Sequence, residues 1–122
     1  MARYPCEMFA HVYYSPALTY EELHAIEEEL LQRLDVMLGG EGAIHLEFWP
    51  DSDSLAVQGE FEEFEPGLLH HLAERVRAIL PASAEARMVF VNKLSLEDII
   101  IYNITPAQVE ETATALPRPF AE

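Results

Sequence analysis

The chain has 122 residues, half of them hydrophobic, and its 22 acidic residues outnumber seven basic ones to give a formal net charge of −15. A field of that sign repels phosphate backbones and anionic lipids, so we expect no direct nucleic-acid binding and no membrane association. The length is that of one domain, which we expect to occupy residues 1–122.

Three further features predict a cytoplasmic location. The only cysteine, Cys6, cannot form an internal disulfide, and the first residues lack the apolar run of a signal peptide. The longest aliphatic run, Ile99 to Ile101, is far too short to cross a membrane.

The first predicted elements are a strand and a long helix. Residues 8–14 are apolar or aromatic on both alternating faces, which is typical of a central strand. Thr19 and Glu22 then have the spacing of a capping box at a helix start. Leucine and isoleucine recur at helical spacing up to Gly39 and Gly40, where we expect the helix to end.

A β-hairpin is predicted over residues 43–61, where apolar residues alternate with polar ones on both sides of a turn at residues 50–53. Residues 51 and 52 are expected at the tip. The opposing pairs would then be Phe48 with Leu55, Leu46 with Val57 and Ile44 with Gly59.

A second helix is predicted from Pro66 to the residue before Pro81, followed by a fourth strand at residues 85–93. The order strand, helix, strand, strand, helix, strand is the split βαβ pattern of the ferredoxin-like fold. We therefore predict an α+β fold with a core at about residues 7–93. Its antiparallel sheet would have the strand order 4-1-3-2, with both helices on one face.

A carboxy-terminal extension, residues 97–116, is predicted beyond this core. Residues 98–104 are rich in isoleucine and indicate a fifth strand. Thr105 and Gln108 have capping-box spacing, with Pro106 in the first turn, so a short helix is expected up to residue 116.

The sheet face without helices is predicted to be unusually aromatic. Its expected residues are Phe9, His11, Tyr13, His45, Glu47, Trp49, Ala56, Gln58 and Glu60. Exposed apolar residues usually occur singly, so three large aromatic side chains on one face indicate that another surface covers it. The expected interface or ligand-binding residues are Phe9, His11, Tyr13, His45, Trp49 and Gln58.

The expected cover is a second copy of the chain, because symmetric homodimers are the commonest assemblies. The fifth strand would extend an edge of the sheet or cross to the partner. The alternative cover is the chain's own carboxy-terminal segment. A face-to-face dimer of this kind resembles the dimeric α+β barrels in architecture alone, and no sequence motif places the chain in one of their families.

Candidate chemistry on this face is limited. His45 and Glu47 are two residues apart on a strand and so share a side, and His11 shares their face. Strand three would separate His11 from His45 by roughly 9 to 10 Å at the backbone. We therefore expect no metal site and no cofactor.

The predicted function is that of a small acidic module, more a binding protein than an enzyme, that self-associates through this face and binds a protein partner or a small ligand. One alternative is a cofactor-free enzyme with His11 or His45 as proton acceptor and Glu47 orienting it. Another is an acidic decoy that imitates nucleic acid. The carboxylates that would carry the decoy are Glu27, Glu28, Glu29, Glu60, Glu62, Glu63 and Glu65.

Overall fold

The computed structural model describes residues 4–51, 53–94 and 98–115, and it confirms the α+β class. The elements in chain order are β1 (Cys6–Tyr14), α1 (Tyr20–Gly40), β2 (Ile44–Pro50), β3 (Ser54–Phe61), α2 (Pro66–Ile79), β4 (Ala84–Asn92), β5 (Asp98–Ile104) and β6 (Val109–Ala115). No helix within the described ranges is long and apolar enough to span a membrane.

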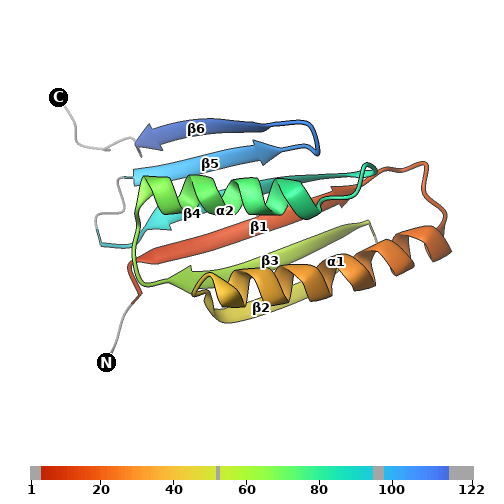
Figure 1. Cartoon of the computed structure of the whole chain (residues 1–122), viewed down its shortest axis with the longest axis horizontal. Helices are drawn as coiled ribbons and strands as arrows, with labels where there is room; N and C mark the ends of the chain where they lie inside the picture. Colours follow the sequence, from red (N-terminus) through yellow and green to blue (C-terminus); the bar gives the residue numbers. More distant parts are fainter. Residues whose placement is uncertain (1–3, 52, 95–97, 116–122) are drawn as a thin grey trace.

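All six strands form one antiparallel sheet in the order β2-β3-β1-β4-β5-β6. The two helices lie side by side on one face, with α1 over the β2–β3 side and α2 over β4 (Figure 1). We call the opposite face, which carries the alternate residues of each strand, the open face.

The start of α1 confirms the predicted capping box. The Thr19 hydroxyl accepts a hydrogen bond from the Glu22 N–H at 3.2 Å, and the Glu22 carboxylate accepts one from the Thr19 N–H at 2.9 Å. The helix continues through Gly40, and the chain then turns at Gly42, whose φ of 97° is a conformation that favours glycine.

The start of α2 has a cap that was not predicted. The Glu65 carboxylate accepts hydrogen bonds from the Gly67 and Leu68 N–H groups at 2.9 and 2.8 Å, while Pro66 occupies the first turn, where its missing N–H costs nothing. The carboxylate also opposes the positive end of the helix dipole, so Glu65 stabilises α2 in two ways.

The core lies between the helices and the sheet. Alternate strand residues point into it together with Leu30, Leu34 and Leu72 of the helices. At its centre, the ring of Phe90 on β4 contacts Phe61 on β3 and Tyr102 on β5, with centroid separations of 6.4 and 5.9 Å.

The β2–β3 hairpin forms as predicted, but in a different register. Phe48 opposes Val57 rather than Leu55. The turn closes through the Asp51 N–H, which donates to the Ser54 carbonyl at 2.8 Å, so the tip moves one residue toward the carboxy terminus. From Glu47 to Pro50 the pairs therefore shift by two residues, and a shift of two leaves each of these side chains on its expected face. Ile44 shifts by only one, to Glu60, because the register changes between Ile44 and Glu47.

The predicted carboxy-terminal helix is wrong, because residues 109–115 form β6. The Thr105 hydroxyl does accept a hydrogen bond from the Gln108 N–H at 3.2 Å, as in a capping box. The Gln108 N–H, however, also donates to the Thr105 carbonyl at 3.3 Å, and the Thr105 N–H donates to the Gln108 carbonyl at 2.9 Å, so the two residues close a hairpin turn. The Gln108 side chain bonds Glu110 instead of reaching back. The chain therefore reverses and pairs with β5.

Candidate functional site: the open sheet face

The open face carries the aromatic side chains that the sequence predicted. Phe9 and Tyr13 on β1 are 38% and 50% exposed, and Trp49 on β2 is 46% exposed. The strand register extends this surface, because Phe9 lies beside Val89 of β4, which lies beside Ile101 of β5. An apolar band therefore crosses three neighbouring strands.

The described part of the tail leaves this surface uncovered. β5 pairs with β4 of the same chain, and β6 pairs with β5, so both widen the sheet in its own plane (Figure 1). Both helices lie on the opposite face. Up to residue 115, then, the carboxy-terminal segment does not fold over the aromatic residues.

A row of three residues crosses the other half of the face. His11 on β1 opposes Ala56 on β3, and Ala56 opposes Trp49 on β2. The two large side chains are thus two strand spacings, about 10 Å, apart with a methyl group between them. The His11 ring is also stacked on Tyr13, with ring centroids 5.8 Å apart. Gln58 lies in the next row, between Phe9 and Glu47.

His45 lies at an irregularity that the sequence did not predict. The β2–β3 register shifts between Ile44 and Glu47, and His45 has a φ of 55°, a left-handed conformation that is uncommon outside glycine. Its Nδ1 lies 2.9 Å from the carboxylate of Glu60, and the ring of Tyr4 meets it edge-on. The partner of His45 is therefore Glu60 and not Glu47, which corrects the expected pair.

Glu60 is the central residue of a small ionic cluster that also contains His45, Lys93 and Glu7. Its second carboxylate oxygen bonds the ammonium group of Lys93, which also lies 4.0 Å from Glu7. The hydrogen bond from Lys93, followed by that from His45, holds the pKa of Glu60 below its usual value. The carboxylate therefore stays ionised and fixes the orientation of the His45 ring.

This arrangement offers limited chemistry. A ring whose Nδ1 bonds a carboxylate keeps Nε2 for exchanging a proton with a bound molecule. His11 does not join it, because Glu60 opposes Glu7, four residues from His11 on β1, or about 13 Å along the strand. His11 and His45 are therefore separated along the strands as well as by the intervening strand β3.

A cysteine nucleophile and a metal site are the two other chemistries to consider. Cys6 is fully buried, and burial raises the pKa of its thiol to about 12, so it stays protonated and a poor nucleophile. Within the described ranges, no three His, Cys, Asp or Glu side chains are grouped closely enough to hold a metal ion.

Several carboxylates of the decoy hypothesis are buried or bonded to other groups of the chain. Glu27 is only 8% exposed, Glu60 bonds Lys93 and His45, and Glu65 caps α2. An exposed row of charge is what imitation of a phosphate backbone requires. The seven carboxylates therefore do not form one exposed row.

Comparisons with known proteins give no further guidance: no family model, no curated protein and no solved structure matches the chain.

The lowered pKa of Glu60 predicts a pH-dependent effect of Glu60→Gln. A carboxylate with a lowered folded-state pKa stabilises the fold above the ordinary glutamate pKa of about 4.3, and this contribution is lost as the pH falls through the lowered value. The variant should therefore unfold at lower urea than the native chain near neutral pH, and the gap should narrow in acid.

Urea midpoints measured from neutral pH to about pH 3 test this expectation. The exposed Glu62 supplies the matched control, and Glu62→Gln should leave the pH dependence of the native chain unchanged. A gap between Glu60→Gln and the native chain that is the same at every pH would contradict the role assigned to the ionised carboxylate.

Proposed function

We propose that the chain is a self-associating binding module in which two copies pack their open faces together and enclose a small ligand between the sheets. The observation that carries this proposal is the exposure of Phe9, Tyr13 and Trp49 on a sheet face that lies opposite both helices. Exposed aromatic surface of this extent marks an interaction site.

The fold proposed for each copy is a ferredoxin-like split βαβ core. The neighbouring strands β2-β3-β1-β4, with α1 and α2 on one face, support it. β5 and β6 extend this core beyond β4 and so enlarge the open face. The dimer would then resemble the dimeric α+β barrels in the way its sheets meet.

The charges on the open face are compatible with the pairing of two copies. Five acidic residues of the described strands lie on the open face with two cations, Arg87 and Lys93; the five are Glu7, Glu47, Glu60, Glu85 and Glu110. The central band of Phe9, Val89 and Ile101 carries no charge. Two cations and five carboxylates give each face a formal charge of −3, so pairing the open faces brings together a fifth of the chain's net charge of −15, around an uncharged centre.

The size of the face also suits a dimer. Six strands at about 4.8 Å spacing and about seven residues of strand length give a projected area on the order of 600 Å². A standard protein interface buries roughly 800 Å² of accessible surface per partner, and accessible area exceeds projected area for a side-chain surface. Pairing two open faces would thus supply an interface of ordinary extent.

The proposed ligand site is the space above Ala56, between His11 and Trp49. A partner sheet would roof this space and make it an enclosed site with aromatic walls and few polar groups, as small-molecule sites commonly are. The chemistry fits a small ligand with a flat apolar body that stacks on Trp49 and one polar group that bonds His11.

The solution mass and the fluorescence of Trp49, measured over one dilution series, test the self-association. Trp49 is the only tryptophan, so it reports on this face alone. We expect light scattering to give twice the chain mass of 13.8 kDa, and emission to move to longer wavelength as dilution lowers the mass.

Two outcomes would refute the proposal. A monomeric mass up to about 0.1 mM chain would place the affinity below that of ordinary stable complexes. A mass that falls on dilution while Trp49 emission stays constant would place the interface on another surface.

A further inference from the structure

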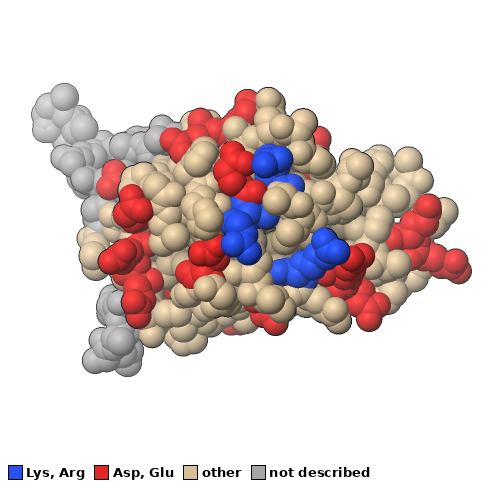
Figure 2. Space-filling view, in the orientation of Figure 1, with Lys and Arg blue, Asp and Glu red and all other residues tan. Residues whose placement is uncertain are grey.

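Three of the five described cations gather on the face of the molecule opposite the open face. Arg33 belongs to α1, and Arg75 and Arg77 belong to α2. In the space-filling view, positive side chains cluster in the middle of the helix-covered face and acidic residues surround them (Figure 2). In a chain of net charge −15, this is a distinctive location for positive charge.

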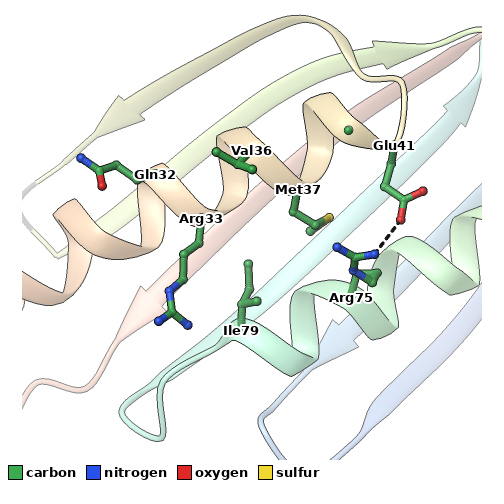
Figure 3. A pocket seen from close by; sticks show the side chains of 8 residues that line it. Gln32, Arg33, Val36, Met37, Glu41, Arg75 and Ile79 are labelled. Carbon is green, nitrogen blue, oxygen red and sulfur yellow. Dashed lines mark hydrogen bonds and ion pairs between the residues drawn. The ribbon is translucent and has the colours of Figure 1, made fainter.

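A groove lies between α1 and α2 at this cluster. It has a volume of about 680 Å³, and Val36, Met37 and Ile79 supply its apolar walls. Arg33 and Arg75 lie along it on opposite helices, as the close view shows (Figure 3). A smaller hollow of about 230 Å³ shares Arg33 and Ile79 and continues the groove along the helices.

The groove opens to solvent at Gly40 and Val36. Gly40 lines it in the last turn of α1, and a Cβ at that position would meet no atom within 4 Å. Val36 is 76% exposed, which is unusual for an aliphatic side chain beside a neighbouring helix. The groove thus presents apolar surface to solvent between two guanidinium groups.

The arginines have capacity for a further anion. Arg33 pairs with Glu29 at 2.8 Å, and Arg75 pairs with Glu41 at 3.2 Å, each through one nitrogen of the guanidinium group. Both arginines are more than half exposed, and ion pairs at such a surface are weak. A guanidinium has five N–H donors and binds a carboxylate with two of them, so a ligand can add to or replace these pairs.

We propose that this groove binds a small organic anion with an apolar body, such as a medium-chain carboxylate. The carboxylate binds Arg33 at one end of the groove, and the chain lies along Ile79, Met37 and Val36 toward Arg75. The volume falls within the range of small-molecule sites, roughly 300 to 1,000 Å³. The site does not depend on self-association, because it lies on the face opposite the proposed dimer interface.

Octanoate titrated into the isotope-labelled full chain, followed by amide NMR spectra, tests the site. We expect saturable shifts confined to residues 32–41 and 75–79. Octanamide has the same body without the charge and should bind at least roughly tenfold more weakly. The same loss is expected for octanoate with the double variant Arg33→Gln, Arg75→Gln, whose spectrum also reports whether it is folded.

Arg87→Gln is the matched control, because Arg87 lies on β4, on the open face. It should bind octanoate as the native chain does. The proposal is wrong if octanoate produces no saturable shift at about 10 mM, well above the weakest affinity considered, about 1 mM. It is equally wrong if octanamide binds the native chain as tightly as octanoate does, or if the double variant binds octanoate as tightly as the native chain does. Shifts that map to β1–β4 would also contradict it.

Discussion

Phe9→Glu is expected to convert the protein from a dimer to a folded monomer. Phe9 lies on β1 at one end of the apolar band on the open face, and its side chain is 38% exposed in the single chain. A monomer tolerates a carboxylate there because water solvates it. In the proposed dimer the carboxylate would lose that water and find an apolar partner surface.

The expected effect is large because a twofold interface contains each substitution twice. Loss of a central aromatic anchor costs roughly 2 kcal/mol or more per copy, so about 4 kcal/mol in total and about a thousandfold in the dissociation constant. Sedimentation or light scattering over a dilution series measures this shift, and circular dichroism verifies the fold.

Tyr20→Glu provides the matched control. It makes the same aromatic-to-glutamate change at a residue that is 78% exposed at the start of α1, away from the open face. This variant should keep the dissociation constant of the native chain. If both variants weaken association equally, added negative charge and not the open face would be the cause.

Phe90→Ala is expected to lower the free energy of unfolding by ~3–5 kcal/mol. Phe90 is fully buried on β4, and its ring contacts those of Phe61 and Tyr102, so the truncation leaves a cavity between these two rings. A domain of this size has a total stability of about 5–15 kcal/mol, so the variant would be close to unfolding.

Urea unfolding followed by circular dichroism measures this loss, with every chain at one concentration because association adds to apparent stability. Tyr20→Ala, at the exposed start of α1, should change the free energy of unfolding by less than about 0.5 kcal/mol. A loss at Phe90 no larger than that of the control would mean that these rings do not form the core.

The aromatic side of the candidate site could be predicted from sequence, whereas its ionic cluster could not. Phe9, Tyr13 and Trp49 occupy alternate strand positions, and alternation alone places them on one face. The pairing of His45 with Glu60 depends on the hairpin register and on the irregularity after Ile44. A turn that closes one residue later changes those neighbours. A polar turn of this kind is compatible with more than one turn position, so the sequence does not determine the register.

The arginines of the helix groove have no sequence signal. Arg33 and Arg75 come from different helices and are brought to one groove only because both helices pack on the same face of the sheet. Neither the spacing of the residues within each helix nor the net charge of the chain predicts that approach.

Two threonines separate what the sequence by itself determined from what the tertiary structure decided. Thr19 and Thr105 both accept a hydrogen bond from the N–H three residues later, and both precede a residue able to complete a capping box. After Thr19, leucines at helical spacing continue the helix on their own. After Thr105, the outer edge of β5 offers unpaired N–H and C=O groups, and residues 109–115 pair with them. The sequence alone determined α1, α2 and the alternating faces of the strands, because those depend on bonds and periodicities within a few residues. Only the tertiary structure decided β6, the hairpin register and the partner of His45, because a strand takes its hydrogen bonds from whichever backbone edge the rest of the fold places beside it.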